Sequence, residues 1–215
     1  MPAAPPLPSF AAAARALAAI GRGFYARGWV LGTSGNFSAV VSRRPLRLAI
    51  TPSAAHKGTL DPRGFLAIDA HGRAAGRARG RPSAETRLHL AIVQARGAGA
   101  VLHTHSVWST LLSDRHAAAG GLSIAGLEML KGLEGVTSHE HTEWIPIVPN
   151  DQDMERLAGV VGKLLDGDRT AHAFLLQGHG LYTWGRTIGV AARHVEILEF
   201  LLEVAGRGGG SPTIK

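Results

Sequence analysis

The chain has no cysteine and no run of about 20 apolar residues. The absence of cysteine excludes disulfides, thiolate nucleophiles and cysteine-bound metal sites, and it leaves histidine, aspartate and glutamate as the side chains for a metal ion. The absence of a long apolar run leaves no segment that is predicted to cross a membrane. Residues 1–10 also lack the basic start of a secretory signal, so we expect a cytoplasmic protein.

Basic residues are in excess, but they are not clustered. The chain has 23 Lys and Arg against 16 Asp and Glu, a formal net charge of +7. Nucleic-acid binding needs such charges gathered on one surface. The densest basic stretch, residues 73–81, is glycine-rich and is predicted to be a solvated loop. We therefore expect no nucleic-acid partner, whereas a basic surface would attract a small anionic substrate such as a sugar phosphate.

Length and composition predict one globular α/β domain over residues 1–215, with flexible ends at 1–9 and 206–215. The chain has 215 residues, of which 45% are hydrophobic and 18% are charged, as in ordinary globular proteins. Short apolar runs separated by short turns predict mostly antiparallel strands. The expected strands are 37–42, 46–51, 64–69, 100–105, 144–148, 173–177 and 181–184, and the expected helices are 10–27, 83–96, 107–113, 151–165 and 187–204, with 124–133 helical in part.

Two histidines on one predicted strand suggest a metal site. Side chains alternate along a strand, so His103 and His105 point to the same side. His179 follows another strand-like run and lies between two glycines. A lone His-x-His pair is as often structural as metal-binding. Three histidines, however, suit Zn²⁺ and leave a fourth position for water or substrate. We therefore predict a metalloenzyme.

Two other stretches are candidates for binding an anion. In the first, Ser34, Gly35 and Asn36 belong to a small, polar segment where backbone N–H groups can approach a ligand closely. In the second, Ser83 is the predicted N-cap of a helix, and helix N-termini bind phosphate. The first stretch, taken alone, is also compatible with a simple turn. Lys57 is interpreted as a surface residue or as a further phosphate contact.

Five motifs together resemble the class II aldolase superfamily in order and spacing, over about residues 10–204. The resemblance implies a three-layer α-β-α fold with a central, mainly antiparallel sheet. It also implies one Zn²⁺ per subunit, bound by His103, His105 and His179, and a homotetramer with its sites near subunit interfaces. The motifs are Gly32–Asn36, Thr51–Ser53 with Lys57, Pro82–Glu85, His103–His105 and Gly178–Gly180.

Within the superfamily, residues 126–131 and 178–185 most resemble a dehydratase branch that acts on a sugar phosphate in methionine salvage. The acid/base carboxylate of that branch matches Glu128, whereas that of the aldolases matches Glu85. This chain has both, so the resemblance leaves the main acid/base open. No tyrosine near the C-terminus matches the acid of fuculose-phosphate aldolase, which disfavours an aldolase.

The phosphate contacts of the aldolases match Asn36, Ser53 and Ser83. Two neighbouring positions depart from the family pattern, because Ala54 and Ala84 stand where glycine and serine are common. The alternatives to a dehydratase are an aldolase or epimerase acting on another sugar phosphate, and a non-catalytic scaffold with the same fold.

Simpler roles exist for the other charged candidates. Glu128 is suitably spaced for a surface pair with Lys131, and Glu85 for favourable contact with a helix dipole. The remaining histidines have no partner at a convincing spacing and are interpreted as structural or exposed: His56, His71, His89, His116, His139, His141, His172 and His194.

Overall fold

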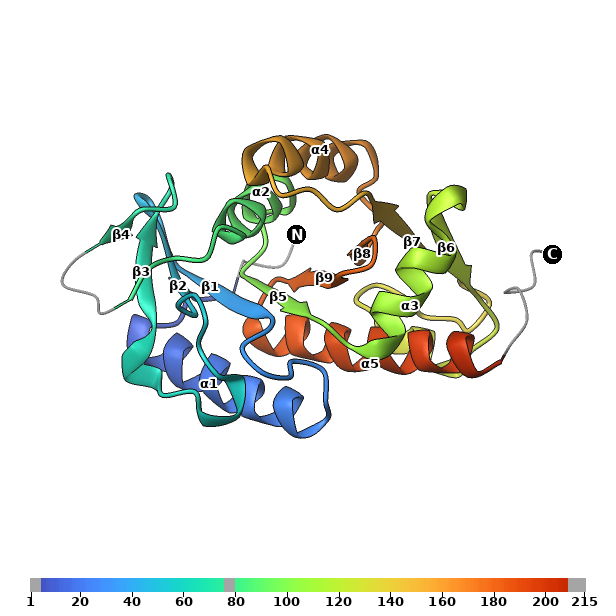
Figure 1. Cartoon of the computed structure of the whole chain (residues 1–215), viewed down its shortest axis with the longest axis horizontal. Helices are drawn as coiled ribbons and strands as arrows, with labels where there is room; N and C mark the ends of the chain where they lie inside the picture. Colours follow the sequence, from blue (N-terminus) through green and yellow to red (C-terminus); the bar gives the residue numbers. More distant parts are fainter. Residues whose placement is uncertain (1–4, 76–79, 209–215) are drawn as a thin grey trace.

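The computed structural model describes residues 5–75 and 80–208 (Figure 1). In these ranges nine strands form one sheet in the order β4-β3-β2-β1-β5-β9-β8-β7-β6. Neighbouring strands pair antiparallel, except that β7 and β8 are parallel. The strands are β1 (Asn36–Arg43), β2 (Leu46–Ile50), β3 (Leu66–Asp69), β4 (Ala74–Ala75), β5 (Ala100–Thr104), β6 (Gly121–Ile124), β7 (Glu143–Val148), β8 (Ala173–Leu176) and β9 (Gly180–Gly185).

Helices cover both faces of the sheet, which confirms the predicted three-layer fold (Figure 1). Helices α2 (Thr86–Arg96) and α4 (Met154–Gly167) pack on one face. Helices α1 (Phe10–Ala26) and α5 (Ile188–Arg207) pack on the other, and α3 (Val107–Arg115) lies against α5. None of the described helices is long and apolar enough to cross a membrane.

Strand β5 lies in the middle of the sheet and is buried along its whole length. Its side chains alternate between the layers, because Val101 joins the core under α2 and α4 while Ala100 and Leu102 join the core over α1 and α5. The same alternation directs His103 towards the α2 side of the sheet. A strand that is buried on both faces has consecutive apolar residues in its sequence, as residues 100–102 show.

Several elements differ from the predictions. Helix α2 begins at Thr86 with Glu85 as its N-cap residue, so Ser83 is not the N-cap; the Ser83 Oγ instead accepts a hydrogen bond from the Glu85 N–H at 3.3 Å. Strand β6 was not expected, and the helix expected within 124–133 is a short 3₁₀ helix, η4 (Glu128–Gly132). Strand β4 was not expected either, because it lies within the stretch 73–81 that was predicted to be a loop. Helix α5 continues to Arg207 and includes the start of the predicted flexible tail. Residues 1–4, 76–79 and 209–215 lie outside the described ranges.

Candidate metal centre

A hairpin brings the third histidine to the end of β5. Strands β8 and β9 are joined by a tight turn in which Gly178 has a φ of +61°, a conformation that favours glycine. The His179 N–H donates to the carbonyl of Leu176 at 3.0 Å and closes the turn. Because β9 pairs with β5, with Leu181 opposite Thr104, the turn places His179 beside the end of β5.

Four side chains converge there. His103, His105, His179 and Glu85 each offer one ligand atom, and these atoms all lie within 4.8 Å of one another. The imidazole centroids are 4.4 Å apart for His103 and His105, 5.0 Å for His103 and His179, and 4.6 Å for His105 and His179. The structure therefore brings the three predicted histidines together and adds a carboxylate.

The hydrogen-bond pattern leaves one imidazole nitrogen free to bind a cation. The His103 Nδ1 donates to the Leu181 carbonyl at 2.9 Å, so the neutral ring carries its lone pair on Nε2. That nitrogen is buried and has no hydrogen-bond partner among the described residues, and it lies 3.5 Å from the Glu85 Oε1. Two acceptors facing each other in a buried site are unfavourable unless a cation lies between them. The group therefore fits a metal ion.

Burial keeps His103 and His105 in the neutral form that binds metal. It lowers the pKa of His103, which is fully buried, and it lowers the pKa of His105 to about 3. Burial alone would raise the pKa of Glu85. Its contacts with His103 and His179 outweigh that effect and hold the pKa of Glu85 well below its usual range. Neutral imidazoles beside an ionised carboxylate form a donor set for a divalent ion.

Glu85 is held in place from behind by a buried amide and a buried imidazole. The Asn36 Nδ2 donates to the Glu85 Oε2, and the Asn36 Oδ1 accepts from the His89 Nε2. The His89 Nδ1 accepts from the Ser38 Oγ at 2.7 Å, and burial lowers the pKa of His89 to about 3, so this ring is neutral. His89 was interpreted as structural or exposed, and it is structural, because it is fully buried and bonded to Ser38 and Asn36, partners that the sequence did not indicate. Its spacing of four residues from Glu85 already placed both side chains on one helix face.

Two further buried residues support β5 and were not found from the sequence. Tyr182 lies opposite His103 in the β5–β9 pair and stacks on its ring at 3.8 Å between centroids. Burial raises the pKa of this tyrosine, and the nearby Glu85 carboxylate raises it further. On the other face of the sheet, the Glu199 Oε1 accepts from the Thr104 Oγ1 at 2.6 Å, and burial raises the pKa of Glu199 to about 7. Tyr182 lies within the segment 178–185 that carries the family resemblance, but no role was predicted for it, and Glu199 belongs to none of the motifs found in the sequence.

The predicted phosphate contacts do not all lie together. Ser53 and Ser83 line one cavity of about 680 Å³ at the start of α2, together with the basic residues Arg73, Arg81 and Arg87. These two serines and the surrounding positive charge suit an anion.

The other predicted phosphate contacts have partners within the chain. The Ser34 Oγ donates to the Leu31 carbonyl at 2.7 Å. Gly35 has a φ of +71°, and a Cβ there would lie 2.6 Å from the His103 carbonyl oxygen. The amide of Asn36 is engaged by Glu85 and His89. These contacts within the chain are enough to explain the small residues of the segment, so an anion is not needed to explain them.

Lys57 is buried, so its interpretation as a surface residue is wrong. Only 1% of the side chain is exposed, and the Nζ donates to the carbonyls of Ala55 at 2.7 Å and Thr33 at 3.1 Å. Burial lowers the pKa of Lys57 to about 8, although the Glu85 charge opposes that shift. The lysine thus joins two loops next to the four-residue group.

Glu128 lies outside the group of potential ligands. It starts η4, its side chain is 70% exposed, and it forms an ion pair with Lys131. The Nδ1 of His139 is 3.9 Å from its other carboxylate oxygen. Within one chain the structure shows the simple surface pair. The catalytic role of Glu128 stays a prediction.

Gly180 is required where β9 passes β5. A Cβ at this position would lie 2.1 Å from the Thr104 carbonyl oxygen and 3.2 Å from the His103 Cε1. We expect Gly180→Ala to force the strands apart, to lower the free energy of unfolding by about 1–3 kcal/mol and to weaken metal retention. Thermal unfolding and metal analysis of the purified variant measure both effects.

The matched control is Gly159→Ala on the exposed side of α4, where a Cβ would meet nothing within 4 Å. Alanine there favours the helix, so this variant should unfold no earlier than the wild type. A Gly180→Ala protein with unchanged unfolding temperature and metal content would contradict the close approach of the two strands.

The fold and this site define a class of protein. Residues 15–205 match the family described as Class II Aldolase and Adducin N-terminal domain, and the chain belongs to that family. Among solved structures, the chain resembles YgbL of Escherichia coli, a putative aldolase/epimerase/decarboxylase, with a TM-score of 0.72 and 26% identity over 91% of this chain and 89% of that one. It also shares its fold with an L-fuculose 1-phosphate aldolase, at a TM-score of 0.76 and 22% identity over 94% and 90% of the two chains.

Its curated relatives include several methylthioribulose-1-phosphate dehydratases. The protein of that name from Parvibaculum lavamentivorans is 45% identical over 90% of this chain and 92% of its own. The one from Sorangium cellulosum is 41% identical over 94% of this chain and 95% of its own. These relatives confirm the predicted superfamily and the predicted resemblance to its dehydratase branch.

Proposed function

We propose that this chain is a lyase that dehydrates 5-methylthioribulose 1-phosphate to 5-methylthio-2,3-dioxopentyl phosphate, a step of methionine salvage. The observation that carries the proposal is the convergence of His103, His105, His179 and Glu85 at the end of β5. The dehydratase names of relatives that cover most of the chain support the substrate.

The proposed cofactor is one Zn²⁺ per subunit, held by His103, His105 and His179. Three neutral imidazoles suit Zn²⁺ and leave a position for the substrate. When bound, such an ion supplies Lewis-acid polarisation of the substrate's carbonyl and hydroxyl oxygens. Glu85 lies 3.3 Å from the His179 Nε2 and 3.5 Å from the His103 Nε2, so it faces any ligand that enters between them.

The chain's carboxylates would move the protons. A base removes the proton on C3, next to the C2 ketone, and the hydroxyl on C4 leaves with a proton as water. The resulting enol then becomes the second ketone. Glu128 is the proposed base and acid, as the dehydratase resemblance implies, and Glu85 is the second candidate because it already faces the histidines. Ser53, Ser83 and the arginines of their shared cavity are proposed to hold the phosphate.

Assembly and location also remain proposals. A homotetramer with sites near subunit interfaces is expected from the family resemblance, and it offers a way for the exposed Glu128 to serve a site in a neighbouring subunit. A cytoplasmic location is expected from the sequence.

The direct test is to give the zinc-loaded protein methylthioribulose 1-phosphate and to measure both the dicarbonyl product and dihydroxyacetone phosphate. Dicarbonyl alone supports the dehydratase. Dihydroxyacetone phosphate would mean cleavage of the C3–C4 bond in place of the C3–H bond, which is the aldolase alternative that the position of Glu85 favours. If neither product forms, the dehydratase proposal fails, and a protein that also takes up no zinc would be a scaffold.

A further inference from the structure

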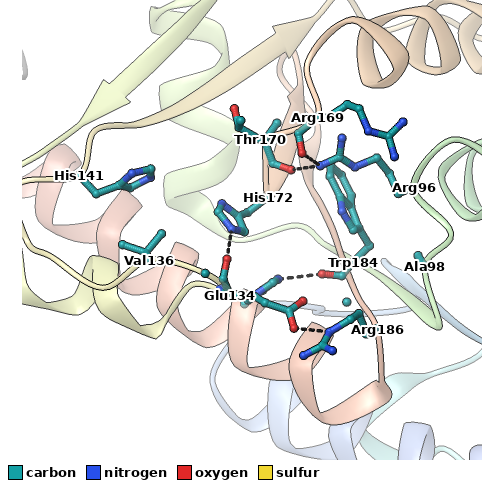
Figure 2. Close-up of a pocket in the computed structure, with 14 residues that line it drawn as sticks. Arg96, Ala98, Glu134, Val136, His141, Arg169, Thr170, His172, Trp184 and Arg186 are labelled. Carbon is teal, nitrogen blue, oxygen red and sulfur yellow. Dashed lines mark hydrogen bonds and ion pairs between the residues drawn. The ribbon is translucent and has the colours of Figure 1, made fainter. Parts of the chain in front are cut away.

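A second polar cluster surrounds a cavity of about 470 Å³ (Figure 2), at the far end of β9 from the metal centre. Strand β9 begins with Gly180, beside His103, and ends with Gly185, which lines this cavity. Figure 2 shows His172 and Glu134 meeting across it, with Arg186 beside the carboxylate. The proposed reaction uses none of these residues.

Both ring nitrogens of His172 face acceptors. The Nδ1 lies 3.0 Å from each carboxylate oxygen of Glu143, and the Nε2 lies 2.8 Å from the carbonyl oxygen of Glu134. Neither partner has a proton to give, so each nitrogen must donate and the ring is an imidazolium. Glu143 is only 2% exposed, and its negative charge balances the ring in the interior.

A second histidine holds the other backbone group of Glu134. The His194 Nε2 accepts from the Glu134 N–H at 3.0 Å, while its Nδ1 donates to the Trp184 carbonyl at 2.8 Å. This ring therefore is neutral, and burial lowers its pKa to about 4. The Arg186 Nε donates to the Glu134 carboxylate as well. Glu134 is thus held through its N–H, its carbonyl and its side chain.

These contacts fix the segment that carries Glu128. Glu134 lies two residues after the end of η4, and Leu130 and Leu133 anchor the same segment in the core against α5. Between η4 and β7 the described chain has no helix or strand that would hold it otherwise. The polar contacts of Glu134 therefore act together with the packing of Leu130 and Leu133 to set where η4 and its first residue lie.

We propose that His172 is a positioning residue, whose imidazolium clamps the Glu134 backbone and thereby orients the segment that presents Glu128. The consequence for turnover rests on the proposed function, because it requires Glu128 to take part in the reaction. The clamp itself does not.

The clamp should weaken at alkaline pH. The groups that face His172 are Glu143 from β7, His141 just before that strand, His194 from α5, Glu134 from the loop and Arg96 from α2. Burial lowers the pKa of His172, but Glu143 and the Glu134 carbonyl outweigh it, so the pKa is raised above its ordinary 6.5. A group with a raised pKa contributes fully below its ordinary value and loses that contribution as the pH rises through the raised value.

The principal test is hydrogen exchange of residues 127–142 in the metal-loaded protein at about pH 6 and about pH 8.5, corrected for the intrinsic rate. Protection should fall at the higher pH in the wild type, and it should be low at both values in His172→Gln. His116→Gln, which replaces a histidine outside the cluster, should behave as the wild type. Metal content should stay unchanged in both variants. Wild-type protection in His172→Gln would overturn the clamp.

The kinetic test separates the clamp from the proposed reaction. His172→Gln should lower kcat by about 10- to 100-fold, as loss of an orienting partner does, with KM nearly unchanged and the alkaline fall of kcat removed. If Glu128→Gln keeps full turnover, the proposed function of Glu128 fails, while hydrogen exchange still decides the clamp. Nitrogen NMR of ¹⁵N-histidine-labelled wild type needs no variant: two protonated ring nitrogens on His172 at about pH 6 support the clamp, and a neutral ring there would overturn it.

Discussion

Replacing His103 by glutamine is expected to remove the metal and to lower kcat/KM by about 10²- to 10³-fold or more. The ring is the most deeply buried of the three, and its free Nε2 faces the other donors. A Lewis-acidic metal contributes several kcal/mol to a reaction of this kind, and each ~1.4 kcal/mol is tenfold in rate. Metal analysis of the purified variant and turnover of methylthioribulose 1-phosphate measure the two effects.

His179→Gln guards against a misfolded result, because the His179 side chain is partly exposed and lies at a turn. The same loss of metal and turnover is expected for this variant, with an unfolding temperature close to that of the wild type. His56→Gln is the matched control outside the group. A folded His179→Gln protein that keeps its metal and its turnover would remove this histidine from the site, and chelation of the wild type that leaves turnover intact would remove the metal from the reaction.

The regular elements were predictable because their apolar periodicity matches how they pack. The predicted helix at 10–27 is α1, and the apolar run at 100–102 is the centre of β5. The strand β6 was missed because its place is fixed by pairing with β7, which the local sequence does not indicate. Ser83 was predicted to be a helix cap because serine suits that role. In the structure its hydroxyl instead accepts from the Glu85 N–H and closes a turn just before α2.

The candidate site was predictable only where neighbours in the sequence carry it. His103 and His105 share a strand face, and His179 stands out between glycines. The buried position of Lys57 depends on two loops closing over it, and local sequence does not record that. The pairing of His172 with Glu143 likewise requires the register of β7 and β8, which no local pattern supplies. Contacts that depend on how separate segments come together were therefore the ones that the local sequence could not predict.

Glu128→Gln should lower kcat by about 10²- to 10⁴-fold, the range of general acid–base catalysis, and should leave the metal in place. Glutamine keeps the size of the side chain and removes the group that accepts and returns the proton. The metal should be retained because Glu128 lies outside the group of potential ligands. The pairing with Lys131 lowers the pKa of Glu128, which keeps the carboxylate in its ionised form.

Glu85→Gln separates the two carboxylates. Because Glu85 belongs to the group of four, its replacement should change metal affinity as well as turnover. Glu140→Gln, an exposed carboxylate in the same segment as Glu128, is the matched control and should turn over normally. If Glu128→Gln keeps full turnover while metal-loaded Glu85→Gln loses its turnover, the proton transfer belongs to Glu85. The metal is present in that variant, so its loss of activity cannot be explained by loss of the metal. If instead Glu128→Gln loses turnover and metal-loaded Glu85→Gln keeps it, the proton transfer belongs to Glu128. The reacting carbons of the substrate must then lie within reach of η4, although Glu128 is not one of the four potential metal ligands.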